Sequence, residues 1–247
     1  MTLIITEISE FGIAMVADSA VTESTDLPSG GTVTRVLNGA KKLQAIPYLR
    51  AGISMWGHGS LKTSNNWIPT DMWVVDFIEQ HQYLTTLDEF ANKLAQELQN
   101  AAGNINEPIG FHLAGLTDSN GECLPVAYHV RNNDGDFIRG YELHEFIPGL
   151  QFLPKLPKTK QFWIIRNGDY GPYAILSQPV WNALKELPKS LDLQIPYPSL
   201  VGRIRYHKTW VRFISDLYNS SELFQTIGGY VTSLGIYYNG QMICDLG

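Results

Sequence analysis

The sequence contains little that would link it to a membrane, a metal or an oxidising compartment. Among its 247 residues there are two cysteines, Cys123 and Cys244, far apart and without Cys-x-x-Cys spacing, so neither a disulfide framework nor a zinc site is indicated. No stretch of about 18 uninterrupted apolar residues suggests a membrane span. Residues 1–17 lack the basic start and small-residue cleavage site of a secretory signal. We therefore expect a cytoplasmic protein with no metal and no cofactor.

Basic residues are also in short supply. The chain has 18 Lys and Arg against 24 Asp and Glu, which gives a formal net charge of −6 and a pI near 5.5. This balance gives no electrostatic reason to approach phosphate backbones or anionic membranes, so nucleic acid is disfavoured as a partner. Because 44% of the residues are apolar and only 17% are charged, the chain can bury a large core. A single domain over residues 1–247 is the expectation.

Hydrophobic patterning predicts runs of strands that alternate with helices. Strands are predicted over residues 2–8, 11–17, 42–46, 49–56, 109–117, 123–131, 137–143, 162–165, 230–238 and 241–246. Helices are predicted over residues 71–82 with Thr70 as the cap, from a Thr86–Glu89 capping box to Gly103, and over residues 173–187 and 199–218. Residues 19–40 are expected to form a long loop or irregular hairpin, and residues 147–160 a surface loop or lid.

This order of elements is hard to arrange as a parallel βαβ sheet. It fits two antiparallel sheets stacked between helix layers. The predicted fold class is therefore α+β, a four-layer α-β-β-α sandwich.

The opening stretch MTLIITEISEFGIAMVADS places a threonine at the start of a hairpin and an acid, Asp18, where the returning strand ends. Removal of Met1 by a methionine aminopeptidase, which a small second residue permits, would give Thr2 a free amine beside its hydroxyl. Because such an amine has a pKa of about 8, its neutral fraction can take the hydroxyl proton, directly or through a water. Asp18 either caps a turn with Ser19 or, because it ends an apolar run, is buried beside a cation.

Several stretches carry a resemblance to a known family. TLIITEISEFGIAMVADS matches an opening pattern of Thr, strand, Gly, strand and Ala-Asp-Ser, and the match continues through KKLQAI, ISMWGHGS, GFHLAGLTDSNGECLPVAYHV and GGYVTSLGIYYNGQMI. The sequence thereby resembles the proteasome β-subunit family of N-terminal nucleophile hydrolases. The likeness covers most of the chain, strongly at the start and weakly between residues 132 and 227.

The resemblance implies a set of site residues. Thr2 corresponds to the nucleophile and Asp18 to the carboxylate that pairs with the family's catalytic lysine. That lysine is assigned to Lys42, with Lys41 as the alternative if the register slips by one. The backbone N–H of Gly57 matches the family's oxyanion donor, a group typically worth about 3 kcal/mol.

Three positions depart from the family pattern. Asn167 stands where the family carries a serine flanked by glycines, and we include it in the predicted site. Phe224 and Ile227 stand before Gly228, where the family carries an aspartate and a serine that help to position the terminal amine.

Two functions are consistent with these residues. The first is a threonine-type amide hydrolase, with a peptidase favoured, that cleaves a peptide or amide substrate through an acyl-enzyme on Thr2. For this enzyme the resemblance implies ring-shaped homo-oligomers whose sites face an enclosed chamber. The alternative is a non-catalytic, proteasome-like structural or interaction subunit. The changes at Asn167 and Ile227 favour the alternative, and the retained Thr2, Asp18 and Lys42 oppose it.

Overall fold

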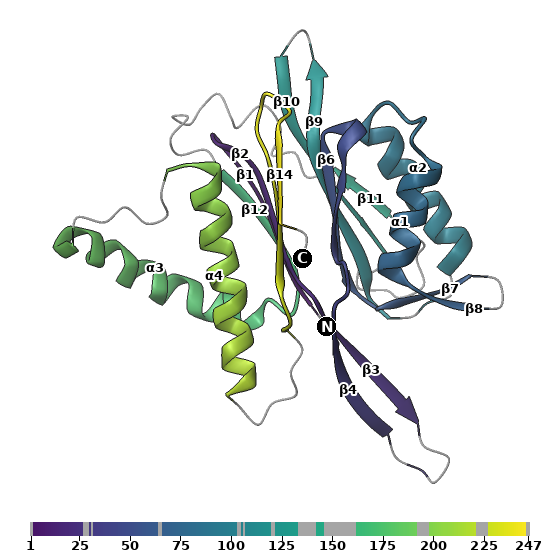
Figure 1. The fold of residues 1–247 in the computed structure, drawn as a ribbon, viewed down its shortest axis with the longest axis horizontal. Coiled ribbons are helices and arrows are strands. Elements are labelled where there is room, and N and C mark those ends of the chain that lie inside the picture. The colour runs from purple at the N-terminus through teal and green to yellow at the C-terminus, as the bar shows by residue number, and fades with distance from the viewer. Residues whose placement is uncertain are drawn as a thin grey trace.

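Two antiparallel five-stranded sheets form the centre of the protein (Figure 1). The structure is a computed structural model. It describes residues 2–26, 30, 32–63, 66–102, 105, 107–119, 122–132, 142–145, 162–191, 198–220 and 227–245. Met1 and the predicted lid over residues 147–160 lie outside this set, as do residues 137–141 of a predicted strand.

The first sheet joins the beginning of the chain to its end. Its strand order is β12-β1-β2-β13-β14. The strands are β1 (Leu3–Ser9), β2 (Gly12–Asp18), β12 (Phe162–Gly168), β13 (Val231–Ile236) and β14 (Met242–Asp245). All residues of β1 and β2 are buried, because both faces of these strands are covered. The nearly continuous apolar run of β2 is typical of a strand covered on both faces.

The second sheet has the order β11-β10-β9-β6-β5. The strands are β5 (Leu43–Ile46), β6 (Ala51–Gly57), β9 (Ile109–Ser119), β10 (Glu122–Arg131) and β11 (Glu142–Glu145), with a 3₁₀ turn η1 (Pro47–Leu49) between β5 and β6. Two separate ribbons consist of β3 (Ala20–Asp26) with β4 (Thr32–Asn38), and β7 (Ser60–Thr63) with β8 (Asn66–Pro69). The first ribbon is a regular hairpin that projects from the body of the protein (Figure 1).

The helices are α1 (Thr70–Gln80), α2 (Leu87–Ala102), α3 (Gly171–Leu191) and α4 (Leu200–Asn219). The predicted capping box of α2 is confirmed, because the Glu89 N–H donates to the Thr86 hydroxyl and the Thr86 N–H donates to the Glu89 carboxylate, each at 3.2 Å. The prediction that Thr70 caps α1 is wrong. Its hydroxyl donates to the carbonyl of His58, and Pro69 occupies the cap position. None of the described helices has the length and apolar character needed to cross a membrane.

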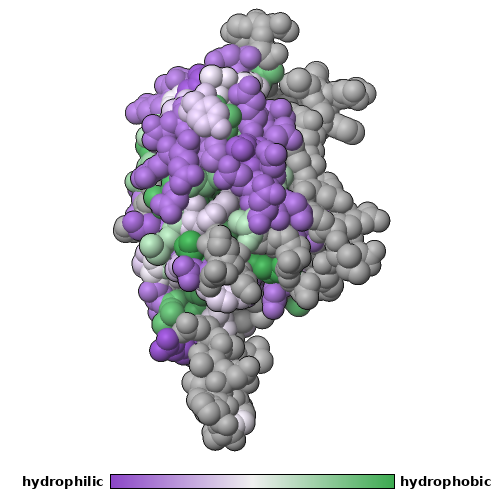
Figure 2. Space-filling view, turned by 90° about the vertical axis from the view of Figure 1, so that its right-hand side faces the viewer, coloured by the Kyte–Doolittle hydropathy of each residue, from purple (hydrophilic) through white to green (hydrophobic). Residues whose placement is uncertain are grey.

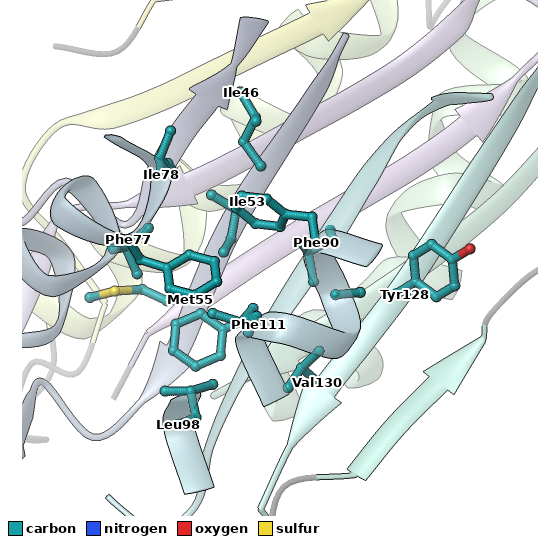
Figure 3. Packing of buried hydrophobic residues seen from close by; sticks show 14 of the residues in the cluster. Ile46, Ile53, Met55, Phe77, Ile78, Phe90, Leu98, Phe111, Tyr128 and Val130 are labelled. Carbon is teal, nitrogen blue, oxygen red and sulfur yellow. The ribbon is translucent and has the colours of Figure 1, made fainter. Parts of the chain in front are cut away.

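Apolar side chains bury three faces of the sheets. One cluster packs α1 and α2 against the outer face of the second sheet (Figure 3). Another lies between the two sheets and includes Ile4 and Met15 from the first, with Leu43 and Ala114 from the second. The remaining large cluster packs α3 and α4 against the outer face of the first sheet. The predicted antiparallel sheets with flanking helices are confirmed at this level.

The outer surface of α1 and α2 is polar. Figure 2 shows that face, and hydrophilic residues cover most of its coloured area. The pattern follows from the amphipathic sequence of α2, in which Phe90, Leu94 and Leu98 are fully buried while Asn92 and Gln96 are exposed.

A buried carboxylate connects α4 to β1. Glu7 is fully buried and accepts a hydrogen bond from Arg203 Nε at 2.6 Å and one from His207 Nε2 at 2.7 Å. Burial by itself raises the pKa of Glu7, but the hydrogen bonds and positive charge of His207 and Arg203 prevail and lower it to about 2. Arg203 on α4 is therefore the ion-pair partner of a buried carboxylate on β1.

The α1/α2 cluster predicts a large effect of Phe90. Phe90→Ala removes a fully buried ring that packs edge-on against Phe77 at a centroid distance of 5.0 Å, and should lower the free energy of unfolding by about 3–5 kcal/mol. Urea unfolding measures this change. Gln96→Ala, on the exposed side of the same helix, should change it by less than about 0.5 kcal/mol. Equal effects of the two substitutions would contradict this assignment of the core.

Glu7 predicts a pH-dependent contribution to stability. Because its pKa is lowered from 4.5 to about 2, the carboxylate stabilises the fold fully above pH 4.5 and loses this effect as the pH falls toward 2. The stability difference between wild type and Glu7→Gln should therefore be largest at pH 7 and shrink by about 3 kcal/mol at acidic pH. Urea unfolding at several pH values tests this, with the exposed Glu79→Gln as control. A constant difference would refute the assignment.

Candidate active site

The opening hairpin brings Thr2 and Asp18 together. In the β1–β2 pairing Ile4 lies opposite Ala17, so the residue before β1 meets the end of β2. The Thr2 hydroxyl donates to Asp18 Oδ1 at 2.5 Å, and the Leu3 N–H donates to the same oxygen at 2.9 Å. Thr2 and Asp18 are 1% and 0% exposed. The hydroxyl is therefore oriented by a carboxylate in a nearly dry environment.

Lys42 reaches the same point from the second sheet. It directly precedes β5, and its ammonium donates to the Thr2 hydroxyl, to the carbonyl of Ala20 and to both oxygens of Asp18, the last two at 3.1 and 3.2 Å. Lys42 is only 4% exposed. Lys41 is exposed, and its backbone N–H donates to Asp71. Of the two lysines considered from the sequence, the structure brings Lys42 to Thr2.

Asp18 is held by backbone donors as well as by Lys42. Its Oδ2 accepts from the N–H groups of Ala20 and Gly228, each at 3.1 Å. The bond to Ala20, two residues along, closes a turn of the kind that short acidic side chains favour. Both sequence-based alternatives for Asp18 therefore hold, since it closes a turn and is also paired with a buried cation.

Burial lowers the pKa of Lys42. The positive charge is disfavoured inside the protein, and this effect prevails over Asp18 and Asp71, whose negative charges raise the pKa. An ammonium with a lowered pKa beside a hydroxyl can exchange a proton with it more readily than an exposed lysine can. The cluster thus contains a hydroxyl, a proton-exchanging nitrogen and an orienting carboxylate.

A hollow opens beside the Thr2 hydroxyl, and Gly57 forms part of its wall. The lining residues are Thr2, Ala20, Val21, Thr22, Lys42, Met55, Trp56, Gly57 and Gly59. Gly57 has φ +90°, and a Cβ there would lie 2.0 Å from the carbonyl oxygen of Pro108. This position accepts only glycine.

The Gly57 N–H points toward the Lys42 side of β6. The Met55 N–H donates to the Lys42 carbonyl at 2.9 Å, whereas the His58 N–H donates to the Pro108 carbonyl at 3.1 Å on the opposite edge. Because backbone groups alternate along a strand, the Gly57 N–H shares the edge of Met55. An N–H there can donate to a ligand atom in the hollow.

Gly168 and Asp169, which are not among the predicted site residues, contact the backbone of Thr2. Gly168 has φ +91°, and a Cβ there would lie 1.9 Å from the Thr2 carbonyl oxygen. That oxygen accepts from the Asp169 N–H at 2.6 Å. The Asn-Gly-Asp stretch carries a signal for this contact, since a glycine at a strand end often marks close backbone approach.

Asn167 lies one residue before this contact, but its side chain bonds to a different group. Its carboxamide oxygen accepts from His112 Nε2 at 2.6 Å. Ile227 is buried in the apolar cluster beneath α4, and Phe224 lies outside the described residues. The structure thus brings together Thr2, Asp18 and Lys42 with Gly57 in the wall of the adjoining hollow, and directs the Asn167 side chain to His112.

His112 and His129 form a polar layer between the sheets. They lie directly opposite each other on β9 and β10. His112 Nδ1 accepts from the Thr6 hydroxyl at 3.1 Å, and burial lowers the pKa of His112 to about 4, against the opposing effect of Asn167. His112 is therefore neutral at physiological pH. Among the described residues, no group of three or more His, Cys, Asp or Glu could hold a metal ion.

Comparison with known proteins gives a likeness in fold. No protein-family model matches the chain, and neither does any curated protein sequence. Among solved structures, a Gly-1 mutant of Anbu from Hyphomicrobium sp. strain MC1 is similar, with a TM-score of 0.51 and 15% sequence identity over 98% of this chain and 85% of that chain. At this identity the likeness concerns the fold alone.

The buried ion pair predicts a strong asymmetry between single and double substitutions. Asp18→Asn leaves the Lys42 cation buried without a counter-charge, and should lower the free energy of unfolding at pH 7 by about 3–5 kcal/mol. The double variant Asp18→Asn/Lys42→Met removes both charges and should lose less than half as much. Urea unfolding of the two single variants, the double variant and wild type measures the coupling.

A surface ion pair provides the matched control for this experiment. Arg50 and Asp118 are joined at 2.6 Å, but the Asp118 side chain is 67% exposed. Asp118→Asn should therefore cost less than about 1 kcal/mol. If Asp18→Asn lowers the free energy of unfolding no more than Asp118→Asn does, the buried pair is not a strongly stabilising contact.

Proposed function

We propose that the protein is a threonine-type amide hydrolase, with a peptidase as the favoured activity. It would use Thr2 as the nucleophile after removal of Met1. One observation carries the proposal: the buried Thr2 hydroxyl is bonded to Asp18 and Lys42 and adjoins a hollow. A hydroxyl needs such neighbours to become a nucleophile at neutral pH.

In the proposed reaction, Thr2 Oγ1 attacks the carbonyl carbon of an amide. The α-amino group of processed Thr2 takes the hydroxyl proton, directly or through a water. Lys42 stabilises the developing alkoxide, and Asp18 orients Lys42. The Gly57 N–H donates to the oxygen of the tetrahedral intermediate. Cleavage of the C–N bond releases an amine that carries the transferred proton. Water then hydrolyses the ester, and the acid leaves with Thr2 regenerated.

Asn167 has an indirect, structural role in this proposal. Its carboxamide is bonded to His112, so we propose that Asn167 supports β12 and does not contact the reacting atoms.

We also propose, from the family resemblance, a single domain over residues 1–247 with the four-layer α-β-β-α arrangement. A ring-shaped homo-oligomer in the cytoplasm, with peptide substrates entering a shared chamber, belongs to the same proposal.

A specific observation favours a second candidate. At Ile227 the chain carries a buried apolar side chain near a position where the resemblance implies a polar group that supports the terminal amine. A subunit that kept the fold and lost the reaction would tolerate this change. The second candidate is therefore a non-catalytic, proteasome-like structural or interaction subunit.

A peptide epoxyketone distinguishes the two candidates, because it must react with both a hydroxyl and a free amine on one residue. Intact-mass analysis of the native protein should show loss of Met1 and one adduct per chain, and Thr2→Ala should remain unmodified. Lys42→Met should slow the labelling by about 10²–10³-fold, since it removes the cation that stabilises the developing alkoxide.

Thr209→Ala is the matched control for this experiment. Thr209 lies on the exposed side of α4, where its hydroxyl donates to the Arg205 carbonyl at 2.9 Å. This variant should be labelled at the wild-type rate. Retention of Met1 in the native protein, or an unlabelled wild type, would reject the enzyme and leave the non-catalytic subunit.

A further inference from the structure

The proposed nucleophile and the proposed oxyanion donor belong to different sheets. Thr2 precedes β1 of the first sheet, whereas Gly57 ends β6 of the second. Their relative position therefore depends on contacts between the sheets. The cluster between the sheets gives apolar, non-directional contacts, with Met15 and Leu234 from the first sheet and Leu43 from the second. A hydrogen-bonded contact would fix the position more sharply, because hydrogen bonds depend on direction as well as distance.

His112 supplies such a contact. It lies on β9 of the second sheet, and both of its ring nitrogens bond to the first sheet. Nδ1 accepts from the Thr6 hydroxyl on β1 at 3.1 Å, and Nε2 donates to the Asn167 oxygen on β12 at 2.6 Å. Thr6 is on the strand that follows Thr2, and Asn167 directly precedes Gly168, whose backbone packs against Thr2. One fully buried ring thus links both strands that hold the nucleophile.

His129 continues this linkage to the other side of the site. Its ring packs edge-on against that of His112 at a centroid distance of 5.0 Å. Its Nε2 accepts a hydrogen bond from the indole N–H of Trp56 at 3.0 Å. Trp56 is joined by a peptide bond to Gly57 and lines the hollow with it. The linkage therefore ends at the backbone that carries the proposed oxyanion donor.

Gly110 makes room for this arrangement. It lies opposite Trp56 in the β6–β9 pairing, and a Cβ there would lie 2.6–2.8 Å from three atoms of the indole ring. The indole therefore packs directly on the backbone of β9, and its N–H is directed to His129. An indole held on one face by a strand and at its N–H by a histidine has little freedom to rotate.

We propose that His112 and His129 are a pair of positioning residues, which set the Gly57 amide relative to the Thr2 hydroxyl through Trp56 on one side and through Thr6 and Asn167 on the other. The inference rests on the proposed function for its effect on reaction rate. Its structural part, the fixing of the β6 end by His129, stands independently. Neither histidine touches the reacting atoms.

His129→Leu and His129→Gln form the central comparison. Leucine removes the acceptor for the indole N–H, whereas the glutamine carboxamide oxygen can replace it. In His129→Leu, the maximal rate of labelling by the peptide epoxyketone should fall by about 10- to 100-fold with little change in the concentration for half-maximal rate, since misplaced groups slow the chemical step. His129→Gln should restore most of the rate. Trp56→Phe, which keeps a ring but removes the donor, should behave like His129→Leu.

His81→Leu is the matched control. His81 is a buried histidine on the opposite face of the second sheet, where it is bonded to Glu97 and to the Phe77 carbonyl. Its replacement should affect stability without changing the labelling rate. A similar loss of rate in His81→Leu and His129→Leu would overturn the proposal, because both effects would then reflect general destabilisation.

Hydrogen exchange tests whether His129 fixes the end of β6, and this measurement does not depend on labelling of Thr2. The backbone amides of residues 55–58 should exchange at least about 10-fold faster in His129→Leu than in wild type, His129→Gln or His81→Leu. Unchanged exchange overturns the inference, whether or not the protein is labelled. An unlabelled wild type with faster exchange in His129→Leu rejects the proposed function but supports the positioning role. If wild type is labelled, an unchanged labelling rate in His129→Leu also overturns the inference.

Discussion

The buried ion pair between Asp18 and Lys42 is the constraint on which the site depends. A carboxylate and an ammonium removed from water are costly unless each finds several partners. Here Asp18 accepts from the backbone of Leu3, Ala20 and Gly228, and Lys42 donates to the carbonyl of Ala20 as well as to Asp18. The start of β1, the end of β2 and the turn before β13 must therefore all meet at this point. The Thr2 hydroxyl lies between the two charges.

Close backbone approach is the second condition for the site. Gly168 lies against the Thr2 carbonyl, and Gly57 lies against Pro108, both in conformations with positive φ that favour glycine. A side chain at either position would push a strand end away from the cluster. The two glycines thus tie the ends of β12 and β6 to the same small region, one from each sheet.

A polar layer lies between the two sheets. Two hydrogen bonds form this layer among apolar neighbours, one between Thr6 and His112 and one between Trp56 and His129. Such a layer stabilises less than well-packed aliphatic side chains would, but it limits how one sheet can slide over the other. A site that takes residues from both sheets requires that the sheets keep a fixed position relative to each other.

Local sequence pattern predicted most of the helices and sheet strands, although not the β7–β8 ribbon, and the contacts that lie within one hairpin. The burial of β2 and the capping box of α2 follow from local pattern, and Thr2 lies near Asp18 because a tight turn fixes the pairing of adjacent strands. The folded structure was needed to choose Lys42 over Lys41, to pair Asn167 with His112 and to bring Arg203 to Glu7. Adjacent residues point to opposite faces of a strand, and a one-residue slip exchanges those faces. The contacts of Lys42, Asn167 and Arg203 join segments far apart in sequence, so local pattern carries no information about their register.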